Sequence, residues 1–410
     1  MKKNASVFSL ILMTGFLIVT LLVSFNHRSA RHAAPEIPLE QDTHDTSLFG
    51  DIQCLPPVVY KNLQVFLLTG DAAANDKEYI TLNEAMQKKY VKVVEKGTVN
   101  ELAIINLSDK YVYINSGEIV KGGKQDRTIS NDVIVGPSQD TIPIASFCVE
   151  SGRWTKRGNE DEGKFSVSTK AVSTRKQKLA AKYYKNQSQV WGKVSEQQNK
   201  LNANLEKHYD IEDAEVRSGE SSSSLQLTLE NKILDTVKTE FDNAFAGLLE
   251  GKNKVLGFAY VINGELYGIE LYNNYKLFRD LWEKHKEAVI LEAITEASDQ
   301  DTIFSVLEPG DIITALKTAE KNKSSKQESV NQYTEIEVKD DSSKVLFSTA
   351  DKEYGGKWLH TNYLVKMKDD QAEDINLRDN MQRNINEGLN NNENPNINQM
   401  QQINELPDNR

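Results

Sequence analysis

Apolar residues follow two different patterns along the chain, and the change between them divides it. From Leu63 to Glu150, short apolar runs such as LQVFLLTG, VKVVEKG and ELAIINL are separated by polar turns, which is typical of successive β-strands. Beyond Trp154, the segments 174–209 and 225–251 are typical of helices instead. The order of strands, helices, a hairpin and a further helix predicts an α+β fold. We expect a β-rich, sandwich-like amino-terminal unit followed by long helices and the hairpin.

Local signals place the ends of several elements. Thr81 followed by Glu84 has the spacing of a capping box, which predicts a short helix over 82–89. The pair Asn263-Gly264 between two apolar runs predicts a tight β-hairpin. The segment NLSDK, residues 106–110, predicts another hairpin turn.

Two long helical segments are predicted beyond Trp154. Residues 174–209 predict one long helix, in which Gly192 is the position expected to weaken or break it. A further helix is predicted over 275–297. This helix closes the main α+β domain, which we place at residues 59–300.

The composition changes twice beyond the main domain. Residues 301–332 contain KTAEKNKSSKQES and are interpreted as a helix end and a charged linker. Residues 333–368 have enough apolar positions for a small strand-rich extension. Residues 369–410 are dominated by Asn and Gln, and we expect a disordered tail because such a segment buries too little apolar area to offset its ordering entropy.

The amino-terminal end carries the longest apolar run. Residues 5–25 contain no charge, follow Lys2 and Lys3, and are numerous enough to cross the hydrocarbon core as a helix. We therefore expect segment 1–25 to be a transmembrane anchor that contacts the membrane through residues 5–25, with the body exported to the cell envelope. A proline-containing linker, 26–58, follows. The alternative is a cleaved signal segment and a secreted body, although the residues after the apolar run fit A-x-A cleavage spacing poorly.

Charge and cysteine content narrow the functional classes. The net charge of -11 over 410 residues gives no broad attraction to nucleic acid, so no nucleic-acid partner is expected. The two cysteines, Cys54 and Cys148, do not make a disulfide framework, although an exported chain leaves a single bridge open. The six histidines are spread apart, and the phosphate-binding loop, H-E-x-x-H and G-x-S-x-G motifs are absent. The sequence thus predicts no metal site and indicates no particular cofactor.

Two polar segments interrupt the strand-rich region and raise the question of a site. They are GEIVKGGKQDR, residues 117–127, and CVESGRW, residues 148–154. Glycines permit a tight turn or a close backbone approach to a ligand, and guanidinium groups suit carboxylates and phosphates. The residues expected to bind a ligand are Gly122, Gly123, Lys124, Gln125, Arg127, Arg153 and Trp154.

The same two segments leave other roles open. Glu118 and Glu150 are candidate catalytic residues that would act as acid and base if their carboxyls lie about 5–10 Å apart. The alternative is structural: Arg127–Glu150 and Arg153–Glu118 would be ion pairs that hold the fold together. Cys148 as a nucleophile lacks a histidine partner at a fixed sequence spacing.

Residues 79–154, above all these two segments, resemble the ARG and Rhodanese-Phosphatase-superfamily-associated protein domain. The similarity continues to about residue 300 through GFAYVINGELYGIELYNNYKLFRDLW. The family's association with ADP-ribosylglycohydrolase-like and phosphatase-like domains implies a nucleotide- or ADP-ribose-like ligand. The resemblance places this role on Glu118, Gly122, Gly123, Lys124, Gln125, Arg127, Cys148, Glu150, Arg153 and Trp154.

Three functions are therefore weighed. The first is a binding module for an anionic small molecule, nucleotide- or ADP-ribose-like, which needs no nucleophile. The second is a hydrolase that uses the paired glutamates. The third is a structural or interaction protein of the envelope, for which the two polar segments would pair off without forming a pocket.

Overall fold

The computed structural model describes residues 49–72, 77–96, 100–153, 155–157, 163–299 and 304–366. The predicted membrane segment 1–25, the predicted linker up to residue 48 and the predicted tail 369–410 lie outside these ranges. Within them, no helix combines the length and the apolar character that crossing a membrane requires. The described fold is of the predicted α+β class.

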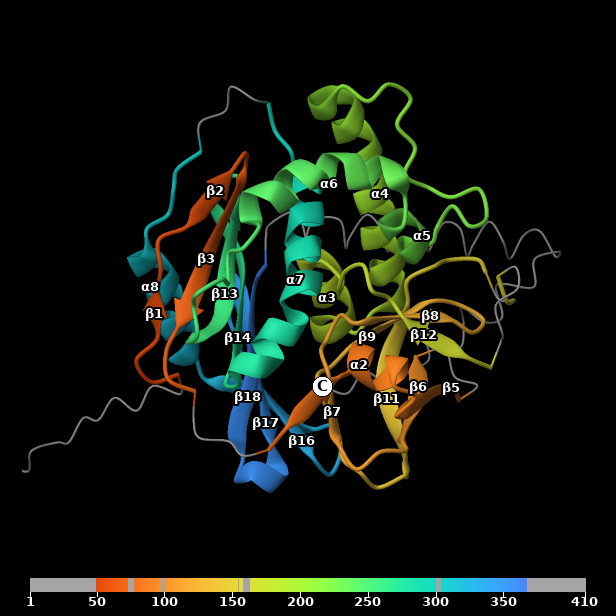
Figure 1. Cartoon of the computed structure of the whole chain (residues 1–410), viewed down its shortest axis with the longest axis vertical. Helices are drawn as coiled ribbons and strands as arrows, with labels where there is room; N and C mark the ends of the chain where they lie inside the picture. Colours follow the sequence, from red (N-terminus) through yellow and green to blue (C-terminus); the bar gives the residue numbers. More distant parts are fainter. Residues whose placement is uncertain are drawn as a thin grey trace, which may run out of the picture. The chain divides into compact units, whose positions relative to one another are not determined.

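Strands from both ends of the described chain build one large antiparallel sheet (Figure 1). Its strand order is β1-β3-β13-β14-β18-β17-β16-β15, with β2 paired to β3. The strands are β1 (Gln53–Cys54), β2 (Val58–Tyr60), β3 (Leu63–Thr69), β13 (Val255–Ile262), β14 (Glu265–Tyr272), β15 (Ser324–Ser329), β16 (Thr334–Asp340), β17 (Lys344–Asp351) and β18 (Lys357–Val365).

The central strands of the large sheet are covered on both faces. Along β3, Leu63 and Val65 belong to one hydrophobic cluster, while Phe66 and Leu68 belong to another. This alternation places successive side chains on opposite faces of the strand. A strand that is apolar at both faces is buried on both, which explains why the apolar and polar positions of LQVFLLTG do not alternate.

Two smaller sheets lie beside the large one. A three-stranded sheet has the order β10-β7-β4, and a six-stranded sheet has the order β12-β8-β9-β11-β6-β5. Apolar side chains from both sheets form one shared hydrophobic cluster. The strands are β4 (Tyr79–Thr81), β5 (Val91–Glu95), β6 (Glu101–Asn106), β7 (Tyr111–Ile114), β8 (Ile119–Gly122), β9 (Arg127–Ile129), β10 (Val133–Val135), β11 (Thr141–Cys148) and β12 (Phe165–Val167).

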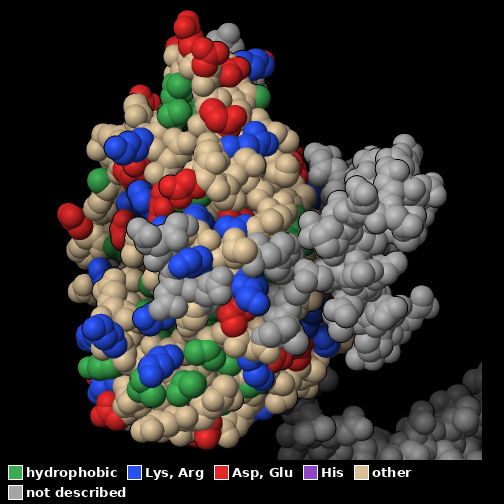
Figure 2. Space-filling view, turned by 90° about the vertical axis from the view of Figure 1, so that its right-hand side faces the viewer, with side chains coloured by type: hydrophobic (Ala, Val, Ile, Leu, Met, Phe, Trp, Pro, Cys, Tyr) green, Lys and Arg blue, Asp and Glu red, His purple; other side chains and the backbone are tan. Residues whose placement is uncertain are grey.

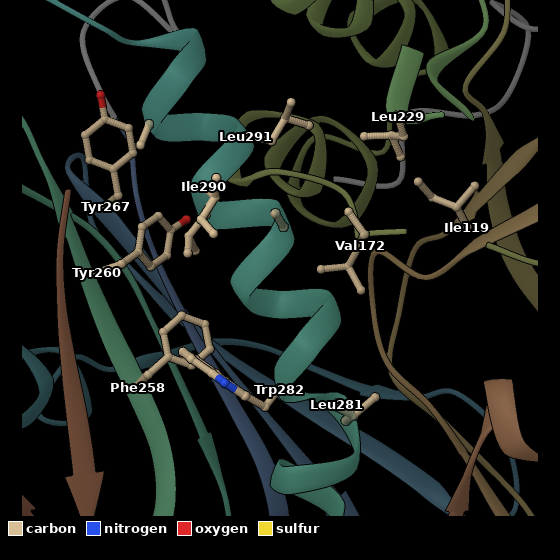
Figure 3. Packing of buried hydrophobic residues seen from close by; sticks show 14 of the residues in the cluster. Ile119, Val172, Leu229, Phe258, Tyr260, Tyr267, Leu281, Trp282, Ile290 and Leu291 are labelled. Carbon is tan, nitrogen blue, oxygen red and sulfur yellow. The ribbon is translucent and has the colours of Figure 1, made fainter. Parts of the chain in front are cut away.

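Helix α7 joins the large sheet to the small-sheet side of the molecule. Figure 3 shows Phe258 and Tyr260 of the large sheet on one side of α7, and Ile119 and Val172 on the other. Burial on several sides explains why this helix carries few exposed positions. The helices are α2 (Leu82–Gln87), α3 (Arg175–Lys178), the π-helix η1 (Leu179–Tyr183), α4 (Gln187–Tyr209), α5 (Leu225–Leu229), α6 (Lys232–Phe245), α7 (Tyr275–Thr295), α8 (Pro309–Glu320) and the short 3₁₀ helix η2 (Lys352–Tyr354).

The strongest local signals are confirmed. The Thr81 hydroxyl accepts a hydrogen bond from the Glu84 amide at the start of α2. Asn263 and Gly264 have φ of +54° and +78° in the turn between β13 and β14. Positive φ at both central residues is what a two-residue hairpin turn of this kind requires.

Two local predictions are wrong. The turn at 106–110 forms, but it is no hairpin, because β6 and β7 belong to different sheets and the Asn106 amide group donates to the carbonyls of Val135 and Gly136. The long helix over 174–209 is interrupted at Lys185, which has φ of +50°, and not at Gly192, which lies inside α4.

The strands predicted for 333–368 form, and they pair into the large sheet through β14 and β18. The residues of the predicted linker, 301–332, include α8 and β15, so this segment is structured where it is described. The boundary drawn at residue 300 therefore does not separate two sheets. Pairing between strands so distant in the chain leaves no local trace in the sequence.

Candidate functional site

The motif GEIVKGGKQDR forms the β8–β9 hairpin and the residues that lead into it. Glu118 directly precedes β8, and Arg127 begins β9. Where the chain turns, Gly122, the last residue of β8, and Gly123 have φ of +120° and +59°, a region in which a residue with a Cβ is strained. A Cβ on Gly122 would also lie 2.6 Å from the Lys164 carbonyl oxygen. The turn itself therefore requires glycine at this position.

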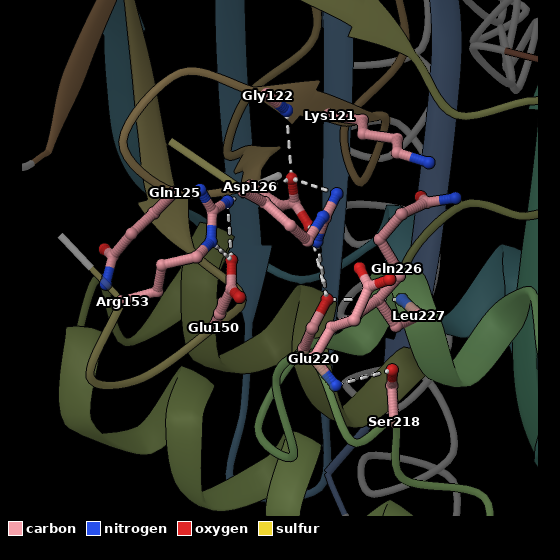
Figure 4. A network of polar contacts seen from close by, with 12 residues as sticks. Lys121, Gly122, Gln125, Asp126, Glu150, Arg153, Ser218, Glu220, Gln226 and Leu227 are labelled. Carbon is pink, nitrogen blue, oxygen red and sulfur yellow. Dashed lines mark hydrogen bonds and ion pairs between the residues drawn. The ribbon is translucent and has the colours of Figure 1, made fainter. Parts of the chain in front are cut away.

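Asp126 is the centre of a group of charged side chains beside this turn (Figure 4). Its buried carboxylate accepts from the Gly122 amide at 2.9 Å and from the Ser224 hydroxyl at 3.2 Å. Nitrogens of Arg157 and Arg153 lie 3.0 and 3.5 Å from the same carboxylate. A buried carboxylate needs such partners in place of water. Asp126 thereby ties the turn to the segment after β11 and to the start of α5.

Arg153 joins the second motif to the first. Its Nε and Nη2 both lie 2.7 Å from Glu150 Oε2, and its Nη1 donates to the Gly123 carbonyl at 3.3 Å. Because both nitrogens reach the same carboxylate oxygen, Glu150 Oε1 has no hydrogen-bond partner among the described residues. The structure thus brings the two polar segments of the sequence together.

Arg127 lies in the same cluster and is almost completely buried. Its Nη1 lies 3.3 Å from the Gln125 side-chain oxygen, and its Nη2 lies 3.7 Å from Glu95 Oε2. The Lys124 amide donates to the other oxygen of Glu95 at 3.3 Å. Two buried donors in this group, Arg127 Nε and Gln125 Nε2, have no acceptor within the described part of the chain.

We call this group the arginine cluster. It consists of three guanidinium groups and three carboxylates, which are those of Arg127, Arg153, Arg157, Glu95, Asp126 and Glu150. The sequence analysis did not identify Glu95 or Arg157 as site residues. Glu95 lies at the end of β5, and Arg157 lies in the polar connection after β11. Neither belongs to a motif with a recognisable spacing. Trp154, a predicted ligand-binding residue, lies outside the described residues.

Glu118 lies at the other end of the β8 strand and has a different partner. Its Oε2 is 2.5 Å from Lys284 Nζ on α7. The predicted ion pairs Arg127–Glu150 and Arg153–Glu118 are therefore wrong in their partners, because Arg153 pairs with Glu150 and Arg127 with Glu95. Strand alternation predicts which residues share a face, but it does not predict which charges meet across strands.

Cys148 is held in a closed backbone environment. The Gln187 side chain accepts from the Cys148 amide and donates to its carbonyl, both at 2.8 Å, as a neighbouring strand would. Burial raises the pKa of the Cys148 thiol to about 12. The thiolate is the nucleophilic form, so this environment disfavours a nucleophilic role.

A second group of charged residues, which we call the inner network, lies between the large sheet and the small sheets. His360 on β18 bridges two carboxylates: its Nδ1 is 3.0 Å from Asp132 Oδ2, and its Nε2 is 2.7 Å from Glu270 Oε2. Lys182 Nζ lies 3.2 Å from Asp132 Oδ2, and Lys178 Nζ lies 2.5 Å from Glu270 Oε1. All five side chains are buried.

The short helix α3 and the π-helix η1 that follows it carry the two lysines of the inner network. Lys178 ends α3, and Lys182 lies four residues later in η1, so both ammonium groups project from one side of the segment. π-helical turns are rare and are frequently found at functional sites. Gly117, the first residue of the first motif, packs so closely that a Cβ there would lie 2.9 Å from Lys178 Cε. The motif therefore touches the inner network at one end and the arginine cluster at the other.

The sequence did not indicate that two of the histidines contact the same tyrosine, Tyr272. His285 on α7 contacts the Tyr272 hydroxyl through Nε2 at 2.8 Å, and the Tyr272 ring stacks on His360 with centroids 4.2 Å apart. Burial lowers the pKa of His285 to about 3, so its ring is neutral at ordinary pH. Within the described residues, no group of three or more His, Cys, Asp or Glu side chains has the arrangement of a metal site.

Comparison with known proteins gives one match. No curated protein and no solved structure matches the chain. A family model of the ARG and Rhodanese-Phosphatase-superfamily-associated Protein domain matches residues 51–364, which contain the arginine cluster, the inner network and the strands of the large sheet up to Leu364 in β18. The chain therefore belongs to the family of the ARG and Rhodanese-Phosphatase-superfamily-associated Protein domain.

Proposed function

We propose that the protein binds an anionic small molecule at the arginine cluster. The observation that carries this proposal is the pair of buried donors, Gln125 Nε2 and Arg127 Nε, that have no acceptor among the described residues. Buried donors are almost always hydrogen-bonded in folded proteins, and each exception calls for an explanation. An oxygen-rich anion supplies the acceptors, and a guanidinium group suits phosphate and carboxylate oxygens.

The cluster is accessible at one edge. The side chains of Arg153 and Glu95 are 9% and 20% exposed, and Lys124 is exposed. Figure 2 shows the face on the side of β5, β6, β8 and β12, where Lys and Arg side chains are spread among Asp and Glu side chains. Because the guanidinium groups already have carboxylate partners, an anion would bind by competing with Glu95 or Glu150 for them.

The ligand class follows from the set of free groups and from the family. Gln125 Nε2 and Arg127 Nε are donors, whereas Glu150 Oε1 is an acceptor. A ligand that carries both anionic oxygens and hydroxyl groups matches this set. A nucleotide- or ADP-ribose-like molecule has both, in agreement with the resemblance noted in the sequence.

The test is a thermal-shift titration of the purified full-length protein with ADP-ribose, ADP, a sugar phosphate and inorganic phosphate. A ligand that binds only the folded state at 100 times its Kd stabilises that state by about 2.7 kcal/mol, so the melting temperature rises. Free ribose serves as the uncharged control. We expect the rise with at least one anion and its loss in the Arg153→Gln variant.

Arg217→Gln is the matched control, since it removes a guanidinium group that pairs with Glu215 elsewhere on the molecule. This variant should keep the response to the anion. If none of the four anions moves the melting temperature of the unaltered protein, the binding proposal fails, and the envelope interaction role becomes the better one.

The hydrolase alternative receives less support from the geometry. Glu118 and Glu150 are each held by a separate cation, Lys284 and Arg153 respectively, and no contact between the two carboxylates is found in the described ranges. An acid–base pair would have to converge on a common cleft. The same anion titration, followed by chromatography of the ligand after incubation, would detect any turnover.

We also propose that residues 5–25 anchor the protein in a membrane and that the body is exported. The support is the uncharged apolar run, which is long enough to span the hydrocarbon core. Cell fractionation of the full chain and of a variant without residues 5–25 tests this. The full chain should sediment with membranes and the variant should not; a full chain that stays soluble with an intact amino terminus rules out the anchor.

A further inference from the structure

The protonation state of His360 follows from its partners. Both ring nitrogens face carboxylate oxygens, Asp132 Oδ2 at 3.0 Å and Glu270 Oε2 at 2.7 Å. An ionised carboxylate only accepts hydrogen bonds, so each ring nitrogen has to carry a hydrogen. His360 is then a buried imidazolium cation between two anions.

The two carboxylates are kept ionised by further partners. Asp132 also accepts from Lys182, from the Thr349 hydroxyl and from the Ser116 amide. Burial by itself would raise its pKa, but the charges of Lys182 and His360 outweigh burial and hold the pKa well below its ordinary value. Burial would likewise raise the pKa of Glu270, but the charge of Lys178 and the hydrogen bond and charge of His360 outweigh burial and lower it.

We propose that His360 is a pH-sensitive connection within the fold: while protonated it joins Asp132, on the loop between β9 and β10, to Glu270 on β14, and on losing its proton it releases one of them. The proposal stands on the bridging geometry and does not depend on the anion proposed for the arginine cluster. The three residues come from three segments that are far apart in the chain. The protonated ring therefore links the large sheet to the small-sheet side at this point, beside the Thr349 hydroxyl of β17, which also donates to Asp132.

Charged and titratable groups face His360 from several elements of the fold. The facing groups come from the β9–β10 loop, β14, β7, α3 with η1, and α7; they are Asp132, Glu270, Tyr272, Tyr113, Lys178, Lys182 and His285. The two carboxylates are the direct partners of the ring. Lys178 binds the other oxygen of Glu270, whereas Lys182 binds the same oxygen of Asp132 as His360 Nδ1. The two ammonium groups oppose the positive charge of the ring but lie one carboxylate away from it. His285 is neutral and adds no charge.

We expect His360 to lose its proton at a pH above the ordinary pKa of histidine. Burial disfavours the imidazolium, but the charges of Asp132 and Glu270 outweigh burial and raise the pKa of His360 above its ordinary value. A raised pKa in the folded state means that the stabilisation is complete below the ordinary pKa of histidine and is lost as pH rises through the folded-state value. A neutral ring has one N–H, so its other nitrogen would then face a carboxylate oxygen with no hydrogen between them.

The test compares melting temperatures of the full-length protein and its His360→Gln variant from pH 6 to pH 10. Glutamine is uncharged at every pH in this range and cannot donate to both carboxylates. We expect the unaltered protein to melt several degrees above the variant at pH 6 and the difference to shrink as pH rises. His208→Gln, which removes a histidine outside the inner network, is the control and should run parallel to the unaltered protein.

A measurement on the unaltered protein covers the case in which the variant does not fold. NMR of ¹⁵N-labelled histidine distinguishes an imidazolium ring from a neutral one. The buried His360 should be an imidazolium at pH 7 and lose its proton only above the ordinary histidine range. A neutral His360 ring at pH 7, or a pH-independent gap between the two melting curves, would overturn the proposal.

Discussion

Asp126 shows how much of the arginine cluster depends on one side chain. Its carboxylate is the common partner of Arg153, Arg157, the Gly122 amide and the Ser224 hydroxyl. The sequence marks this residue only as one charge in a polar motif. Its partners come from the turn before it, from the segment after β11 and from the start of α5, so its role becomes visible only when these three are together.

We predict that Asp126→Asn lowers the free energy of unfolding by about 3–5 kcal/mol, because it removes a buried negative charge that Arg153 and Arg157 share and leaves the arginine cluster with an excess of positive charge. Urea denaturation followed by circular dichroism measures this. The control is Glu230→Gln, which removes the partner of Lys121 in a pair whose side chains are 34% and 27% exposed. A half-exposed pair is worth about 0–1 kcal/mol, so equal losses in the two variants would contradict the assignment of Asp126.

Gly122 offers a second test at the residue scale. Alanine at this position meets both a φ of +120° and the Lys164 carbonyl oxygen, so Gly122→Ala should cost more than the roughly 1–3 kcal/mol of backbone strain alone. Gly152→Ala is the matched control, since Gly152 has φ of +85° with nothing within 4 Å of the added Cβ. Chemical denaturation should give the Gly122→Ala variant a lower free energy of unfolding than the Gly152→Ala variant. If the two variants are equally stable, the close approach at Gly122 is not what requires glycine.

At the scale of elements, the segment 174–209 shows how a helix ends in a different place from the one its composition indicates. Gly192 is the poorest helix former in α4, yet α4 runs through it. The chain instead changes direction at Lys185, and Asn186 starts α4 by accepting from the Gln189 amide at 3.0 Å. The break lies just after η1, whose Lys182 belongs to the inner network together with Lys178 at the end of α3.

The start of α4 is tested by Asn186→Ala. Removing this N-cap leaves a helix-terminal amide without its acceptor and should lower the free energy of unfolding by about 1 kcal/mol. Asn186→Asp keeps a side-chain oxygen at the same place and should retain most of the stability. Urea midpoints of the two variants give the comparison, and an alanine variant as stable as the parent would show that tertiary packing alone fixes the helix start.

For the whole molecule, α7 and the inner network connect the large sheet to the small sheets. Apolar contacts carry most of this connection, since side chains from both sides share one hydrophobic cluster with α7. The charged groups at the centre make its stability depend on pH. One group that acts on the acid side is His285, whose burial holds its pKa at about 3.

The unfolded chain therefore takes up a proton at His285 before the folded chain does. The stabilisation from a neutral, buried His285 is present above pH 6.5 and is lost as pH falls from 6.5 towards 3, by up to about 1.4 kcal/mol per pH unit. Unfolding free energies measured between pH 7 and pH 4 should show this slope. The His285→Gln variant should show a smaller slope of unfolding free energy against pH. If its slope equals that of the unaltered protein, other groups cause the acid sensitivity.

Part of the fold could be predicted from local patterns. The cap at Thr81, the Asn263-Gly264 turn and the helix after Tyr275 each depend on residues within a few positions of one another. For the candidate site, the sequence indicated that the two polar segments belong together. It did not indicate their additional partners, Glu95 and Arg157, which reach the arginine cluster from other parts of the chain.

The sequence by itself determined the class of the fold, the turns and caps, and the family, because these depend on the periodicity of side chains and on short motifs. Only the tertiary structure decided that β18 pairs with β14 and that His360 consequently meets Glu270 and Asp132. The physical reason is the distance along the chain between the residues that interact. Helical and strand periodicity is set between near neighbours, whereas the pairing of distant strands, and the charges that it brings together, depends on how whole elements pack.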